Sequence, residues 1–434
     1  MEIHVKESTI VQPAQETPRH CLWNSNLDLL VPMFHVSTVY FYRRPNDSSN
    51  FFDTSVLKEA LSNVLVPFYP MAGRMGRDET GRLQIICNAE GVLFIEAETN
   101  SIVDDFGDFA PSLKLQQLIP TMDYSLNISS YPLLILQVTR FKCGGICLGV
   151  LLHHILADGS SAIHFINAWA GMTRGLPVSI MPFINRTILR DGVPPSPTFH
   201  HVEYDQPPSM NPLARSDKLQ SSPEPTSTAM IKLSAEQINL LKAKSKKDNV
   251  RFSTYEILAA HIWHCVCKAR ELPDDQASKL YVVTDGRSRL NPPLPPGYFG
   301  NVLFTATCTW NSGDVQSKPL IHTVEKIHAA LKRMDDDYLK SALAFLDQQH
   351  DVTVLRRGTH TFKCPNLNVV SWMRLPFYDA DFGWGRPVFV APASVIFEGT
   401  VYISPSPSND GSLSLAICLQ THHMQLFKNC LFDF

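Results

Sequence analysis

Two stretches of strand length and apolar character lie close together in the first half of the chain. Residues 133–139 are mainly apolar, residues 146–153 are almost entirely so, and the turn sequence Lys142-Cys143-Gly144-Gly145 separates them. Short apolar runs bounded by turn residues are typical of buried strands. The pattern therefore predicts a hairpin of two buried strands.

A helical pattern follows the second of these stretches. Residues 160–169 begin with two serines that can cap a helix, and apolar side chains then recur at helical spacing up to a stop near Gly175. The chain therefore predicts a strand, a tight turn and a helix in succession. A side chain at such a junction is held firmly and can still face a cleft.

A proline-rich stretch at residues 194–228 divides the chain into halves of similar size. Its prolines stand among Ser, Asp and Gln, at Pro194, Pro195, Pro197, Pro207, Pro208, Pro212, Pro223 and Pro225. This composition supplies neither regular backbone pairing nor an apolar face, which indicates an extended crossover. Because 434 residues exceed the size at which one core keeps growing, we expect an N-terminal domain at residues 1–193 and a C-terminal domain at residues 229–434.

Composition narrows the class of protein. The chain is 44% hydrophobic and 18% charged with a formal net charge of −3, which gives no electrostatic reason to expect nucleic acid or an anionic membrane as a partner. The first residues lack the pattern of a secretory signal, and the apolar runs are too short to span a bilayer. Ten cysteines without a Cys-x-x-Cys pair favour free thiols in a reducing compartment. We expect a cytoplasmic protein that acts on small molecules.

The strand-to-helix junction carries the strongest candidate chemistry. It reads His153-His154-Ile155-Leu156-Ala157-Asp158-Gly159, and an imidazole at the end of an apolar strand suits the deprotonation of a hydroxyl near neutral pH. Alternation along a strand puts the two histidines on opposite faces, so only one can meet a substrate. Gly159 lets the chain turn so that the Asp158 carboxylate orients His154 or braces the turn. The alternative is that Asp158 only caps the helix and His154 is a buried histidine.

Spacing alone is weak evidence for such a site. The same His-x-x-x-Asp spacing recurs at His201 and Asp205, where no apolar strand precedes it and no glycine follows, and we interpret it as a chance match. A zinc site built on His153 and His154 is disfavoured, because adjacent histidines point apart and the sequence has no His-x-x-x-His pair. We expect no metal.

A second motif, Asp381-Phe382-Gly383-Trp384-Gly385, lies in the other half of the chain. Together with the His154-to-Asp158 motif it closely resembles the plant acyl-CoA-dependent acyltransferases known as the BAHD family. Nonribosomal peptide condensation domains share the first motif, but the second disfavours them. Further stretches resemble the hydroxycinnamoyl-CoA shikimate/quinate hydroxycinnamoyltransferase branch, and rosmarinic acid synthases are similar too; these stretches are residues 22–26, 40–42, 66–74, 104–111 and 296–301.

The resemblance implies a fold and an activity. The fold would be α/β, with two chloramphenicol-acetyltransferase-like domains, each a mixed sheet with helices, joined by the long crossover and separated by a solvent channel. The protein would be a monomer without metal or prosthetic group, and acyl-CoA would be a co-substrate.

The activity would be transfer of a p-coumaroyl or caffeoyl group from CoA to a hydroxyl of quinate or shikimate, giving a chlorogenate-type ester. The alternatives are another acceptor, such as hydroxyphenyllactate or an amine, and a non-catalytic scaffold that binds a small molecule.

The resemblance also assigns residues to roles in the reaction. His154 would be the general base and Asp158 its support. Asp381 would hold the fold, the alternative being a second base, and its carboxylate would pair with an arginine, for which Arg287 is our first choice. The residues of structural importance would be Arg287, Gly383 and Trp384.

Substrate-binding residues are implied in the same way. Arg357, immediately before Gly358, matches the arginine that clamps the carboxylate of shikimate or quinate, a task that suits the paired donors and permanent charge of a guanidinium. The other acceptor-side residues would be Thr38, Tyr40, Val370 and Trp372, and the CoA-side residues would be Ser253 and Arg289. Val370 departs from the pattern, since shikimate-using relatives carry a threonine there, and on this basis we expect quinate to be favoured.

Overall fold

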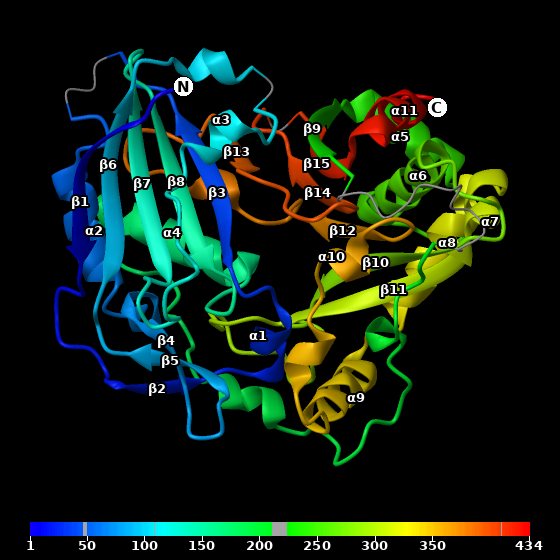
Figure 1. Cartoon of the computed structure of the whole chain (residues 1–434), viewed down its shortest axis with the longest axis horizontal. Helices are drawn as coiled ribbons and strands as arrows, with labels where there is room; N and C mark the ends of the chain where they lie inside the picture. Colours follow the sequence, from blue (N-terminus) through cyan, green and yellow to red (C-terminus); the bar gives the residue numbers. More distant parts are fainter. Residues whose placement is uncertain (47–49, 108, 211–223, 409) are drawn as a thin grey trace.

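The computed structural model describes residues 1–46, 50–107, 109–210, 224–408 and 410–434. It contains two six-stranded mixed sheets that lie side by side, each with helices packed against it (Figure 1). The predicted α/β class, with two sheet-rich units, is confirmed.

The first sheet has the strand order β1 (His4–Val11), β6 (Val92–Thr99), β7 (Leu134–Phe141), β8 (Ile146–His153), β3 (His35–Tyr42) and β13 (Phe389–Pro392). The predicted hairpin is confirmed as the antiparallel pair β7 and β8, in which Leu136 lies opposite Val150. Strand β13 comes from the second half of the chain, and its Ala391 pairs with Val39 of β3. The second half therefore completes the edge of the first sheet.

The second sheet has the order β11 (Leu303–Asn311), β10 (Ala277–Asp285), β12 (Leu367–Ser371), β14 (Thr400–Pro405), β15 (Leu413–Gln420) and β9 (Thr226–Leu233). Strand β12 pairs in parallel with both β10 and β14, whereas the other neighbours are antiparallel. A small third sheet is formed by β2 (His20–Trp23), β5 (Leu83–Cys87) and β4 (Arg74–Arg77).

Helices cover both large sheets. The helix predicted after the junction is α4 (Gly159–Thr173), and the indole N–H of its buried Trp169 donates to the carbonyl of Leu57 in α2 (Thr54–Val64) at 3.0 Å. The remaining helices are α1 (Asn26–Leu30), α3 (Leu113–Gln116), α5 (Ala235–Lys244), α6 (Thr254–Ala269), α7 (Ser312–Ser317), α8 (Leu320–Lys332), α9 (Asp336–Asp347), α10 (Thr359–Phe362) and α11 (Thr421–Leu431). No helix in the described part of the chain is long and apolar enough to cross a membrane.

The structure describes only part of the predicted crossover, because residues 211–223 lie outside the described residues. Its described part includes a short 3-10 helix, η4 (Val202–Tyr204), and the start of β9 at Thr226. The backbone N–H groups of Thr198 and Phe199 donate to the hydroxyl of Ser341 in α9, at 2.8 and 3.0 Å. This segment is therefore packed against the second half rather than extended through solvent. The domain limits at residues 193 and 229 stay a prediction.

Candidate active site

A cavity of about 990 Å³ is lined by residues of both large sheets, such as Tyr40 of β3 and Val370 of β12. This volume is at the upper end of the range for small-molecule sites. Of the residues predicted from the sequence, those that line the cavity are Thr38, Tyr40, His154, Asp158, Ser253, Arg289, Arg357, Val370 and Trp372. Those outside its lining are Arg287, Asp381, Gly383 and Trp384.

The two adjacent histidines lie on opposite sides of the backbone. His154 follows the last residue of β8, its N–H donates to the carbonyl of Phe34 at 3.1 Å, and its half-buried imidazole lines the cavity. The side chain of His153 is fully buried and packs edge-on against His35 with 5.0 Å between ring centroids. Only His154 is placed to meet a substrate.

The surroundings of His154 keep its imidazole neutral. Burial lowers its pKa below the usual value, and this effect outweighs the opposing influence of Asp158 and Asn301. A neutral imidazole can accept a proton near pH 7, which a general base must do.

Asp158 makes no hydrogen bond with His154, because its carboxylate accepts hydrogen bonds from other groups. It accepts hydrogen bonds from the Arg287 guanidinium at 2.8 and 2.9 Å, from the N–H of Ser161 at 3.0 Å and from the N–H of Val302 at 3.1 Å. Burial acts to raise the pKa of Asp158, but Arg287 and these N–H groups outweigh it and hold the pKa below its usual value. Asp158 therefore caps α4 and braces the turn without touching the imidazole.

The prediction that Arg287 pairs with Asp381 is wrong, because Arg287 pairs with Asp158 and Asp285. One Asp381 oxygen instead accepts from the N–H groups of Gly383 at 2.8 Å and Gly385 at 3.0 Å. Both glycines have positive φ, at +101° and +104°, which lets the chain fold back around the carboxylate. The sequence pattern contained no information about which cation, if any, would lie near Asp381.

The aromatic residues of the second motif pack against the first half of the chain. The ring of Phe382 meets Trp169 of α4 with 4.7 Å between centroids, and Trp384 lies 5.1 Å from Phe52. The hydroxyl of Tyr42 in β3 donates to the carbonyl of Ala380 at 2.7 Å. This placement gives the motif a role in joining the two halves.

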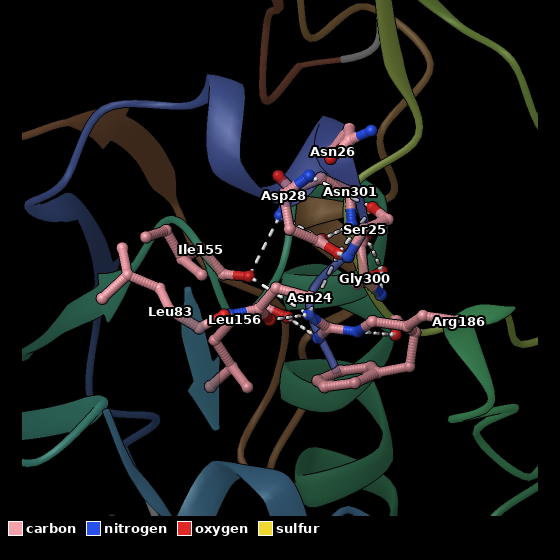
Figure 2. A network of polar contacts seen from close by, with 12 residues as sticks. Asn24, Ser25, Asn26, Asp28, Leu83, Ile155, Leu156, Arg186, Gly300 and Asn301 are labelled. Carbon is pink, nitrogen blue, oxygen red and sulfur yellow. Dashed lines mark hydrogen bonds and ion pairs between the residues drawn. The ribbon is translucent and has the colours of Figure 1, made fainter. Parts of the chain in front are cut away.

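A buried polar network that the sequence analysis missed holds the turn after His154 (Figure 2). The fully buried Arg186 guanidinium lies 3.2 Å from the Asp28 carboxylate and donates to the carbonyl of Leu156 at 2.6 Å and to the side chain of Asn24 at 2.7 Å. Asn24 belongs to one of the stretches that carried the family resemblance, whereas Arg186 follows an irregular segment with no local signal.

Asn301 connects this network to the catalytic candidate. Its amide nitrogen lies 3.0 Å from Asp28 and 2.9 Å from the carbonyl of His154. Its amide oxygen and the Nδ1 atom of His154 are both buried without a hydrogen-bond partner among the described residues. A buried donor and acceptor left unpaired are costly. The Asn301 side chain acts to raise the pKa of His154, so these two groups are candidates to pair with each other.

Comparison with known proteins identifies the family. A model described as the Transferase family matches residues 1–431. The chain belongs to this family of acyltransferases. Among its relatives, a shikimate O-hydroxycinnamoyltransferase of Nicotiana tabacum is 58% identical and a hydroxycinnamoyl-CoA:5-hydroxyanthranilate N-hydroxycinnamoyltransferase of Avena sativa is 52% identical, each over the full length of both chains. The crystal structure of vinorine synthase has the same fold, with a TM-score of 0.76, 24% identity, and coverage of 98% of this chain and 96% of that one.

The residues predicted for the acceptor side come from separate parts of the chain. Thr38 and Tyr40 lie on β3, Val370 lies on β12, and Trp372 directly follows that strand with its ring 4.8 Å from that of Phe377. Arg357 lies between the 3-10 helix η6 (Val352–Leu355) and α10. Residues far apart in the sequence thus line the same cavity.

The two residues predicted for the CoA side, Ser253 and Arg289, both make hydrogen bonds within the protein. The hydroxyl of Ser253 donates to the Glu256 carboxylate at 2.6 Å as part of the capping box of α6. The Arg289 guanidinium donates to the carbonyls of Leu331 and Met334, at 3.2 and 2.9 Å. These contacts favour a helix-capping role for Ser253, and they hold the Arg289 guanidinium at the C-terminal end of α8. No group of three His, Cys, Asp or Glu side chains suited to a metal occurs within the described ranges.

Proposed function

We propose that this acyltransferase moves a hydroxycinnamoyl group, p-coumaroyl or caffeoyl, from CoA to a hydroxyl of shikimate or quinate. The observation that carries the proposal is the presence of a neutral base, His154, and a cation, Arg357, in the lining of one cavity. A base and a carboxylate-binding arginine in one site suit an acceptor that carries both a hydroxyl and a carboxylate. The similarity to the Nicotiana tabacum shikimate enzyme supports this choice of acceptor.

In the proposed mechanism, the neutral imidazole of His154 takes the proton of the acceptor hydroxyl as its oxygen attacks the thioester carbonyl. The tetrahedral intermediate then collapses and expels the CoA thiolate, and the protonated His154 donates its proton to this thiolate. The acyl group passes directly between the substrates, and no acyl-enzyme forms.

We propose that Asn301 sets the tautomer of His154. In this proposal the Asn301 amide oxygen, which is buried without a partner among the described residues, accepts a hydrogen bond from Nδ1, which then carries the proton. The other ring nitrogen, Nε2, is left as the proton acceptor. Asn301 thereby takes the orienting task that the sequence analysis considered for Asp158.

Binding of the CoA phosphates is proposed for Arg289. Arg289 lines the cavity, and among the described residues a single nitrogen of its guanidinium donates to protein carbonyls. We also propose that the protein is a cytoplasmic monomer. All ten cysteines are free thiols, which suits a reducing compartment, and both walls of the cavity come from one chain.

The test is acyl transfer by the purified protein. It is incubated with p-coumaroyl-CoA or caffeoyl-CoA and, separately, with shikimate, quinate, hydroxyphenyllactate and 5-hydroxyanthranilate, while thiol release and product mass are followed. We expect acceptor-dependent CoA release with shikimate or quinate, and a chlorogenate-type ester from quinate. Release with hydroxyphenyllactate or the amine alone would replace the proposed acceptor, and release with none of them would contradict the function.

A further inference from the structure

We propose that Tyr204, in the segment that the sequence predicts to be a mere crossover, is an acceptor-binding residue that selects for carboxylated acceptors; this rests on the proposed function. Tyr204 ends η4 and lines the same cavity as His154 and Arg357. The site would therefore draw its acceptor specificity from the connection between the halves as well as from the sheets.

Tyr204 lies directly against the guanidinium of Arg357. The Cζ atom of Arg357 is 5.5 Å from the centre of the Tyr204 ring and 5.6 Å from that of the Tyr281 ring. Such contacts stabilise a cation and orient its plane. Arg357 also donates to the hydroxyl of Thr305 and, at 3.2 Å, to the carbonyl of Glu203, the residue before Tyr204. The η4 helix thus fixes the arginine through both a ring and a carbonyl.

The hydroxyl of Tyr204 is available to a ligand. Within the described ranges it makes no hydrogen bond with the protein, and the partly buried side chain of Tyr204 lines the cavity. Burial raises the pKa of Tyr204, so the hydroxyl stays protonated and can donate. Tyr204 and Arg357 lie side by side in the lining of one cavity. A hydroxyl donor beside a guanidinium is matched to a carboxylate, or to a hydroxyl next to a carboxylate.

A buried polar network holds η4 in place. His201 lies between the Glu203 carboxylate, at 3.1 Å, and the hydroxyl of Ser341, at 2.9 Å, and the second Glu203 oxygen accepts from the hydroxyl of Tyr338 at 2.6 Å. The ammonium of Lys279 donates to the carbonyl of Val202. Burial of so many polar groups is tolerated only when they are paired. The extent of pairing here indicates that the position of η4 is built into the fold.

The stacking of Tyr204 adds to this rigidity. Its ring lies parallel to that of Phe345 in α9, with centroids 5.2 Å apart. A ring held in this way gives a fixed hydroxyl position, as a specificity contact requires, because a 1 Å displacement would weaken the hydrogen bond. The His201-to-Asp205 stretch therefore positions an acceptor contact, although its spacing resembles a catalytic motif only by chance.

Two variants distinguish the role of the Tyr204 hydroxyl from the role of its ring. Tyr204→Phe removes only the hydroxyl, and we expect the KM for shikimate or quinate to rise roughly 3- to 10-fold, as for loss of one hydrogen bond, while the KM for acyl-CoA stays within about 2-fold. Tyr204→Leu removes the ring as well, and we expect it also to reduce the preference for the carboxylated acceptor over its carboxamide by about 5-fold or more. Melting curves verify that both variants are folded.

The matched control is Tyr281→Phe. It removes the hydroxyl from the other ring beside Arg357, but that hydroxyl is buried and outside the cavity lining, so its effect on the acceptor KM should be smaller than that of Tyr204→Phe. The proposal would be overturned if Tyr281→Phe and Tyr204→Phe raised the acceptor KM equally. It would also be overturned if Tyr204→Phe and Tyr204→Leu were folded and kept the acceptor KM and the acceptor selectivity of the wild type. Failure of the proposed function looks different, because wild-type protein would then transfer no acyl group to any carboxylated acceptor.

Discussion

The Arg287 guanidinium makes paired hydrogen bonds of 2.8 and 2.9 Å to the Asp158 carboxylate, which is 1% exposed. The pair joins the start of α4 in the first half of the chain to the turn that follows β10 in the second. We expect Asp158→Ala to lower the free energy of unfolding by about 3 kcal/mol, because it leaves a largely buried cation without its partner. Urea denaturation measures this loss.

Asp285 provides the comparison for this prediction. It also pairs with Arg287, at 3.2 Å, but its side chain is 44% exposed. We expect Asp285→Ala to cost less than about 1 kcal/mol, as is usual for exposed pairs. If Asp158→Ala and Asp285→Ala lowered the free energy of unfolding equally, burial of the Asp158 pair would not be the cause of its contribution to stability.

The turnover of the enzyme should depend on a base with a depressed pKa. Because burial lowers the pKa of His154 and the reaction needs its neutral form, kcat/KM should rise with pH to a plateau, with the midpoint below 6.5. His154→Ala should reduce kcat by about 100-fold or more. A midpoint above 7, or turnover that survives in His154→Ala, would contradict the assignment of this base.

Asn301 can be tested through the same pH profile. The Asn301 side chain raises the pKa of His154, so Asn301→Ala should move the midpoint of kcat/KM to lower pH and reduce kcat. The KM for acyl-CoA serves as the control, since Asn301 lies outside the cavity lining. A profile unchanged from wild type would exclude an orienting role.

The stability of the protein should fall on mild acidification. His35 is 4% exposed, and burial lowers its pKa to about 4 despite the opposing effect of the Pro132 carbonyl. Between pH 6.5 and 4 the unfolded chain binds a proton that the folded chain does not, so His35 makes stability rise with pH across this window. The loss on going down to pH 4 is about 3 kcal/mol from this group. Urea denaturation at several pH values measures it, and His35→Gln should flatten the slope.

Asp381 should matter for stability more than for chemistry. Its carboxylate accepts two backbone hydrogen bonds within its own turn and lies outside the cavity lining. We expect Asp381→Asn to lower the free energy of unfolding by about 1 to 2 kcal/mol, while folded protein keeps its KM for acyl-CoA. A variant that melts like wild type but has lost turnover would instead support a second base.

The clamp assigned to Arg357 predicts a selective effect on the acceptor. Loss of a charged hydrogen bond costs about 1.5 to 3 kcal/mol, so Arg357→Ala should raise the KM for shikimate and quinate by roughly 10- to 100-fold. The KM for acyl-CoA is measured alongside. An equal rise for carboxylated and uncharged acceptors would contradict the clamp.

Local patterns along the chain determined a good part of this structure. The hairpin of β7 and β8, the helix α4 and the position of His154 at their junction follow from apolar periodicity and capping, which act between residues a few positions apart. The two motifs and the long stretches around them were sufficient to indicate the family and the α/β fold.

Only the tertiary structure decided which charged groups meet. Asp158 and Arg287 are 129 positions apart, and Arg186 and Asp28 are separated by more than a hundred residues as well. Whether two such groups pair depends on how sheets and helices pack, because the energy of a buried charge is set by its neighbours in space. For the same reason Asp381 proved to be paired with its own backbone, and the predicted crossover placed Tyr204 against Arg357.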